Sequence, residues 1–145
     1  MKNELINEEF SWKETWFLEK LFFDEEMVLE IHVIKGQKEP ATELVVAGVD
    51  LGPVFPVVRD YSKKVIIRFK YPLTFQRLDE SFAAEKGGTY TGQRFCIYTE
   101  SEYLQYFEKV RYGGLINKPI QHYCLTCADD IIDILSCEPP EIMTD

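Results

Sequence analysis

The sequence predicts an α+β protein, built mostly from an antiparallel β-sheet of about seven or eight strands, with one main helix near residues 101–111 packed on it. Two observations support this prediction. Several short runs alternate between apolar and polar residues and are joined by hairpin-length connections. One segment combines a helix start signal with apolar residues at helical spacing. The 145 residues, 46% of them hydrophobic, suffice for one core and contain no linker, so a single domain over residues 1–145 is expected.

The first predicted element is a hairpin. The runs WFLEKLFF (16–23) and MVLEIHVI (27–34) are rich in strand-forming residues and flank three acidic residues. In the second run the odd-numbered residues are apolar, whereas Glu30 and His32 fall on the other face. We therefore expect one buried and one solvated face, with His32 exposed.

The middle of the chain predicts further strands. TELVVAGVDL (42–51) is almost continuously apolar, which predicts one strand buried on both faces. SKKVIIRFKYP (62–72) alternates and is the clearest half-buried strand. LTFQRLDE (73–80) and RFCIYT (94–99) are shorter strands, and the glycine pairs within residues 84–92 predict a mobile loop between them.

The one predicted helix follows Thr99, which has capping-box spacing to Glu102. Apolar residues then recur at i, i+3, i+4 and i+7, namely Tyr103, Tyr106, Phe107 and Val110. Gly113 and Gly114 supply the stop signal. We expect this helix to cover one side of the sheet.

The stretch HYCLTCADD (122–130) carries the most suggestive chemistry. Its simplest interpretation is a central strand that ends in an acidic turn, after which IIDILSC (131–137) pairs back with Ile131 opposite Cys127. In that register His122 and Asp133 lie on opposite faces. Thr126 and Asp129 also offer capping spacing, so residues 129–136 remain open between strand and helix.

A thiol-redox or zinc-binding protein centred on Cys124 and Cys127 is the alternative hypothesis. Its potential metal ligands are His122, Cys124, Cys127 and Cys137. Residues three apart in a strand point to opposite faces, so an extended CxxC places its thiols apart. The main hypothesis is therefore of buried structural thiols, with no metal or cofactor.

Charge and missing motifs narrow the function. With 25 acidic and 16 basic residues the formal net charge is −9, which disfavours nucleic acids and anionic membrane surfaces. Neither a leader peptide nor a membrane span is evident, so we expect a cytoplasmic protein. Nucleotide-binding and hydrolase motifs are missing too. These features favour a non-catalytic acidic binding protein, such as an immunity-type or antitoxin-type inhibitor of a basic protein.

Two kinds of binding site are compatible with that function. Aromatic residues ringed by acids, together with the acidic turn, form the candidate partner-binding set Trp12, Trp16, Glu8, Glu9, Asp129 and Asp130. A small-molecule-binding domain, with an aromatic-lined pocket between sheet and helix, is the other possibility.

Overall fold

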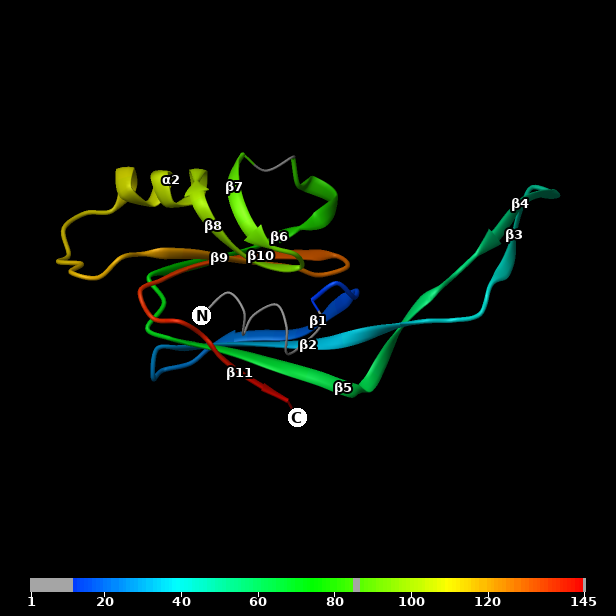
Figure 1. Cartoon of the computed structure of the whole chain (residues 1–145), viewed down its shortest axis with the longest axis horizontal. Helices are drawn as coiled ribbons and strands as arrows, with labels where there is room; N and C mark the ends of the chain where they lie inside the picture. Colours follow the sequence, from blue (N-terminus) through cyan, green and yellow to red (C-terminus); the bar gives the residue numbers. More distant parts are fainter. Residues whose placement is uncertain (1–11, 85–86, 145) are drawn as a thin grey trace.

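The computed structural model describes residues 12–84 and 87–144, which fold into two facing antiparallel sheets with a long hairpin arm projecting from them (Figure 1). The first sheet has the strand order β1 (Trp16–Phe23), β2 (Val28–Lys38), β5 (Val57–Lys70) and β11 (Glu141–Thr144). The second sheet has the order β6 (Thr74–Asp79), β10 (Asp130–Ser136), β9 (Gln121–Thr126), β8 (Phe95–Ser101) and β7 (Gly88–Gly92).

The coarse prediction of a mostly antiparallel β protein is confirmed. The described residues contain eleven strands, more than the seven or eight expected, and one α-helix, α2 (Glu102–Val110). Part of the excess is β7, which pairs with β8 over residues 88–92, so the predicted mobile loop is wrong for that part of residues 84–92. No helix in the described ranges is long and apolar enough to cross a membrane.

The hydrophobic core lies between the two sheets. Alternation along the strands turns one side chain in two inward, as the period of a β-strand requires. The first sheet contributes Leu29, Ile31, Val33, Val65, Ile67 and Phe69. The second sheet contributes Phe95, Ile97, Tyr123, Leu125, Ile132 and Ile134. The predicted strands around residues 27–34 and 62–72 therefore bury the expected faces, except for Met27 and Tyr71 at their ends, which are exposed.

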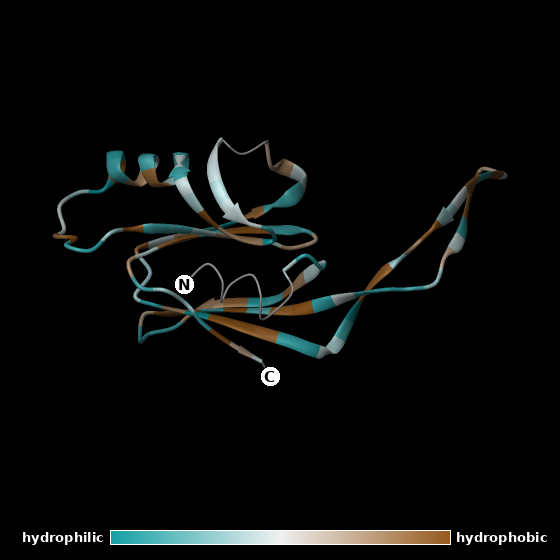
Figure 2. Ribbon diagram, viewed as in Figure 1, coloured by the Kyte–Doolittle hydropathy of each residue, from teal (hydrophilic) through white to brown (hydrophobic). Residues whose placement is uncertain are grey.

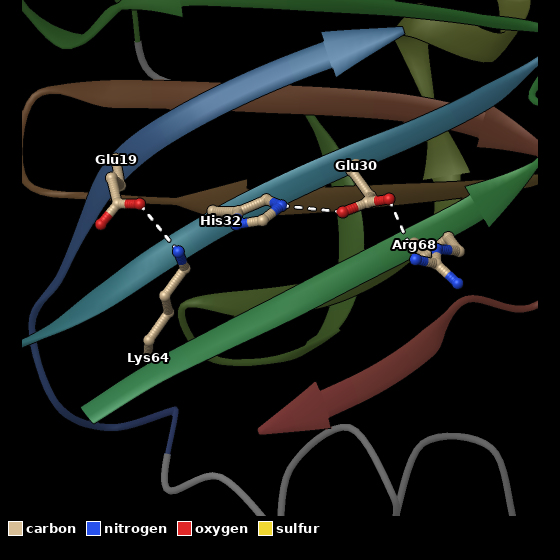
Figure 3. Close-up of polar contacts among 5 residues, drawn as sticks. All are labelled: Glu19, Glu30, His32, Lys64 and Arg68. Carbon is tan, nitrogen blue, oxygen red and sulfur yellow. Dashed lines mark hydrogen bonds and ion pairs between the residues drawn. The ribbon is translucent and has the colours of Figure 1, made fainter. Parts of the chain in front are cut away.

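The outer face of the first sheet carries a group of ionic contacts (Figure 3). Glu30 accepts from His32 at 2.8 Å and from Arg68 at 3.0 Å, while Lys64 donates to Glu19 at 2.9 Å. Burial alone would raise the pKa of Glu30, yet the hydrogen bonds from His32 and Arg68 lower it below its ordinary value. The predicted exposure of His32 is wrong, because its side chain is buried.

The arm replaces the single buried strand predicted over residues 42–51. Strands β3 (Thr42–Val46) and β4 (Val49–Val54) form a separate two-stranded hairpin, and β3 is exposed along its whole length. Ala47 and Gly48 connect them with φ values of 51° and 80°, as a type I′ turn requires. The apolar run is thus folded back on itself, outside the core.

The helix α2 lies on the outer face of the second sheet (Figure 1). The helix falls within the predicted residues 101–111, but its N-cap is Ser101, whose Oγ accepts from the Leu104 backbone N–H at 2.9 Å, so the predicted cap at Thr99 is wrong by two residues. Tyr103 fixes the helix to the sheet, because its ring contacts the His122 imidazole edge-on at 5.3 Å.

Candidate functional site

The pairing of β9 with β10 differs by one residue from the predicted register. Ile131 lies opposite Thr126 rather than Cys127, so Asp133 lies opposite Cys124. A shift of one residue moves every side chain of a strand to the other face. The prediction that His122 and Asp133 occupy opposite faces is therefore wrong, and both lie on the outer face of the second sheet.

This register assembles a buried chain of hydrogen bonds. His122 Nε2 lies 2.7 Å from Asp133 Oδ1, and His122 Nδ1 lies 2.7 Å from Ser101 Oγ. Gln76, directly opposite Asp133 on β6, donates from Nε2 to Asp133 Oδ2 at 3.1 Å. Ser101, His122 and Asp133 are each at most 7% exposed. Ser101, His122 and Asp133 thus satisfy one another away from water, and the exposed Gln76 holds the outer oxygen of Asp133.

The direction of each hydrogen bond follows from what its partners can donate. A carboxylate only accepts, so His122 Nε2 carries the proton that faces Asp133. In the neutral imidazole with its proton on Nε2, Nδ1 accepts from the Ser101 hydroxyl. The Ser101 oxygen in turn accepts from the Leu104 N–H. Asp133, His122 and Ser101 therefore link the centre of the sheet to the first turn of α2.

A pocket of about 190 Å³ opens beside this chain, between the sheet and α2. Its lining includes Gln76, Tyr98, Glu102, Tyr103, His122 and Asp133. The Tyr98 ring stacks on the His122 imidazole with centroids 4.5 Å apart and planes at 12°. Burial, with a smaller effect of the Asp133 carboxylate, raises the pKa of Tyr103 against the opposing hydrogen bond from Thr74.

Serine, histidine and aspartate in a chain suggest a hydrolase, yet the geometry here gives Ser101 a different task. The residues that line the pocket do not include Ser101. A nucleophile must face the atom that it attacks, with its lone pair available. Because Ser101 Oγ accepts from the Leu104 N–H and forms a hydrogen bond with His122 Nδ1, it acts as a helix cap that positions the imidazole.

The three cysteines of the predicted metal-ligand set, Cys124, Cys127 and Cys137, do not lie together. Cys127 belongs to the main core, whereas Cys124 lies in a smaller cluster on the outer side with Cys96, its neighbour on β8. Cys137 is partly exposed near the end of β10. Burial raises the pKa of Cys127 to about 12, so its thiol stays protonated at neutral pH. In the described ranges no three His, Cys, Asp or Glu side chains are grouped to hold a metal ion.

The open question over residues 129–136 is also answered, since β10 occupies residues 130–136. The segment after Cys127 is therefore a tight turn followed by a strand. No helix N-terminus is placed there to lower a thiol pKa.

The predicted partner-binding set is dispersed. Trp12 and Trp16 are 0% and 3% exposed, so the prediction of an exposed aromatic patch is wrong for both. Their rings lie 5.1 Å apart and fill one end of the core, where Trp12 contacts Phe95 edge-on at 5.4 Å. Glu8 and Glu9 lie outside the described residues. Asp129 is exposed, and Asp130 forms an ion pair with Arg77.

Much of the arm is made of hydrophobic residues, as Figure 2 shows, and many of their side chains are exposed, which sequence reasoning missed. We call this set the apolar arm surface; each member is at least 40% exposed, and they are Leu44, Val45, Val46, Val49, Leu51, Phe55, Val57, Val58 and Tyr61. Residues 42–54 contain two acids, Glu43 and Asp50, and no basic residue. The Ala47-Gly48 pair in the middle of the apolar run was the available signal.

A scan against models of protein families finds no family that matches this chain, and searches of curated proteins and of solved structures find no match either.

Proposed function

We propose that the protein binds a partner protein without catalysis, and that the arm is its contact surface. The observation that carries this proposal is the exposure of the apolar arm surface, in which Val45, Val49 and Leu51 are each more than half exposed. An isolated two-stranded hairpin is marginally stable in water at best. A run of exposed apolar side chains on such an element is typical of a segment that a partner covers.

The negative charge of the arm favours a basic partner. Glu43 and Asp50 give its outer part a charge of −2, and the whole chain has a formal net charge of −9. A negative field accelerates association with a positively charged protein. The complementary surface on the partner is an apolar groove bordered by lysine or arginine.

The backbone of the arm offers a second contact. In the described residues β3 and β4 pair only with each other, so each has one edge without a strand neighbour. An unpaired edge can add a strand of a partner through main-chain hydrogen bonds. The arm therefore supplies apolar side chains, two acids and a strand edge to the same groove.

Inhibition of a basic enzyme is the role that these properties fit. The arm extends well beyond the body of the protein, as Figure 1 shows, so it can enter a cleft while the sandwich remains outside. An acidic protein that occupies such a cleft excludes an anionic substrate by charge and by volume. Immunity-type and antitoxin-type inhibitors belong to this class.

The experiment compares three baits in native lysate at low salt. The wild-type chain is compared with the double variant Val45→Asp/Leu51→Asp and with Leu115→Asp, which replaces a residue that is 95% exposed and lies outside the arm. We expect wild type and Leu115→Asp to retain one basic protein, and the arm variant to lose it. Capture that survives in the arm variant, an acidic partner, or no capture at any salt concentration would contradict the proposal.

A further inference from the structure

Two cysteines lie directly opposite each other in the second sheet. Cys96 on β8 pairs with Cys124 on β9 in an antiparallel ladder of regular register. The flanking residues Ile97 and Leu125 turn inward to the main core, whereas both cysteines belong to the smaller cluster on the outer face. Both are thiols in this structure. Two oxidisable side chains therefore lie on the same face of neighbouring strands.

The backbone distance across this pair suits a disulfide. Thr126 donates its N–H to the Arg94 carbonyl at 2.7 Å, two residues along the ladder from the cysteines. Because hydrogen-bonded and non-hydrogen-bonded pairs alternate, Cys96 and Cys124 belong to the hydrogen-bonded class, in which the Cα atoms are about 5.5 Å apart. A disulfide joins Cα atoms that are about 4.4–6.8 Å apart. The bond can therefore form without a change of register between β8 and β9.

The Cβ atoms must approach each other slightly for the bond to form. Opposite residues of antiparallel strands have Cβ atoms about 4.5–5.5 Å apart, whereas a disulfide prefers about 3.5–4.5 Å. A disulfide at this position is therefore strained, and strained disulfides are reduced more easily than structural ones. The pair is suited to reversible oxidation rather than to a permanent cross-link.

The surroundings of Cys96 give a small oxidant a route to one sulfur atom. Gly92 on β7 lies opposite Cys96 on the side away from β9, and a Cβ at this glycine would stand 3.2 Å from the Cys96 Cβ. The strand β7 has five residues, four of them exposed, and forms one edge of the sheet. Exposed edge strands open more readily than central ones. Cys96, which is 4% exposed against 1% for Cys124, is the thiol that an oxidant reaches first.

We propose that Cys96 and Cys124 form a reversible disulfide when a hydroperoxide oxidises the protein. The Cys96 sulfur attacks one peroxide oxygen and becomes a sulfenic acid, while the O–O bond breaks and the leaving oxygen takes up the thiol proton as water or an alcohol. The Cys124 sulfur then attacks the Cys96 sulfur, the S–O bond breaks, and the hydroxyl group leaves with the second thiol proton as water. The two thiols together lose two electrons, which the peroxide gains.

This modification is separate from the proposed contact of the arm. The arm continues β2 and β5 of the first sheet, whereas the two cysteines lie on the outer face of the second sheet (Figure 1). The segment between the cysteines contains α2, Glu102–Val110. The disulfide therefore ties together the two ends of the segment that carries the helix.

The experiment treats the folded, reduced chain with hydrogen peroxide, blocks the remaining thiols in denaturant and maps disulfides in the monomer by tryptic mass spectrometry. Cleavage after Arg94 and Arg111 separates Cys96 from Cys124. We expect a peptide pair joined by these two cysteines, lighter by two hydrogen atoms than the separate thiol peptides, and dithiothreitol should release it. Oxidation without a joined pair, or a bond to Cys137 in its place, would overturn the proposal.

Matched variants identify the partner of Cys96. Cys124→Ser should abolish the link, whereas Cys127→Ser, which replaces a thiol of the main core, should leave its yield unchanged. Oxidation in urea tests the role of the fold, because in the unfolded chain the shorter loop should join Cys124 to Cys127 instead. A link that persists in Cys124→Ser, or an equal yield of the link between Cys96 and Cys124 in urea, would contradict the proposal.

Discussion

His122 Nε2 lies 2.7 Å from Asp133 Oδ1, although the two residues are not opposite each other in the sheet. Asp133 faces Cys124, two residues along β9 from His122, so the contact runs diagonally across the β9–β10 ladder. Gln76 and Ser101 hold the outer ends of the same chain of hydrogen bonds. The arrangement ties β6, β9, β10 and the start of α2 together, and it forms the floor of the pocket.

This contact predicts strong energetic coupling. Replacing one partner by an apolar residue, as in His122→Phe or Asp133→Leu, leaves one buried polar atom of the other without the hydrogen bond it makes here, which should cost about 2–4 kcal/mol of unfolding free energy. The double variant should be at least about 1 kcal/mol more stable than the sum of the single effects implies. Urea denaturation of the four proteins measures this cycle. Additive effects would mean that the two side chains do not interact.

Ser101 is predicted to stabilise the fold through both of its contacts. Ser101→Ala removes the cap of α2 and the partner of His122 Nδ1, at an expected cost of about 2–3 kcal/mol. Thr99→Ala is the control, since Thr99 Oγ1 makes one exposed bond, to the Thr89 carbonyl at 3.2 Å. That substitution should cost less than about 1 kcal/mol. Equal losses of unfolding free energy in Ser101→Ala and Thr99→Ala, measured by urea denaturation, would contradict the special role of Ser101.

The thiols should differ sharply in reactivity. Cys137 is partly exposed, whereas Cys127 is buried and its pKa is raised to about 12. At pH 8 a disulfide reagent should therefore react rapidly with Cys137 and only on unfolding with Cys127. Cys137→Ser should remove the rapid phase, and Cys127→Ser should leave it unchanged. A rapid phase that persists in Cys137→Ser would assign it to another thiol.

Glu30 should make stability fall in acid. Its pKa is lower in the folded state than in the unfolded state, because the bonds from His32 and Arg68 outweigh the opposing effect of burial. The stabilisation is therefore complete above the ordinary glutamate pKa of about 4.3 and is lost as the pH falls through the folded-state pKa. Glu30→Gln should flatten the pH dependence of unfolding in that range.

Glu19 offers a graded comparison for this experiment. Its pKa is also lowered, chiefly by the hydrogen bond from Lys64, but its side chain is more exposed than that of Glu30. Solvent and salt screen such a pair, so Glu19→Gln should change the acid profile less, and added salt should erase its effect. Parallel profiles for wild type and Glu30→Gln would contradict the role of Glu30.

Substitutions in the turn at the tip of the arm should either stabilise or destabilise the hairpin. Ala47 has a φ of 51°, a left-handed conformation that costs a residue with a Cβ about 1 kcal/mol. Asn tolerates it better, so Ala47→Asn should slow amide exchange at the hairpin, whereas Gly48→Ala should accelerate it. Exchange rates of Val46 and Val49 report the effect. Identical rates in both variants would mean that the tip does not form this turn.

The sequence predicts correctly those strands in which apolar and polar residues alternate because one face packs against the other sheet. In β2 and β5 the inward residues pack against a second sheet, so burial and periodicity coincide. The prediction that His32 is exposed fails because neighbouring side chains cover the imidazole on the outer face of the sheet. The Phe22 and His32 ring centroids, for example, are 5.6 Å apart. Periodicity shows which way a side chain points, and it does not show what lies above it.

The contact between His122 and Asp133 was not predicted because it depends on a shift of one residue in the turn between β9 and β10. Cys127 donates its backbone N–H to the Asp130 carbonyl, which closes the turn one residue away from the assumed register. Nothing in the composition of Ala128 and Asp129 distinguishes the two registers. Long-range packing also hides the role of Trp12 and Trp16, which close the core instead of facing a partner. Both errors concern contacts between segments distant in sequence.

The ladder of β2 and β5 is interrupted between Ile34 and Lys35, just where these strands leave the sandwich for the arm. A bulge bends its strand and increases the local twist. The irregularity lies one residue beyond Val33 and Val65, the last inward pair of the body, so the strands change course where they no longer cover the core. The change in direction toward the arm is thus made outside the core, and the paired segment that covers the packed interior keeps a regular register.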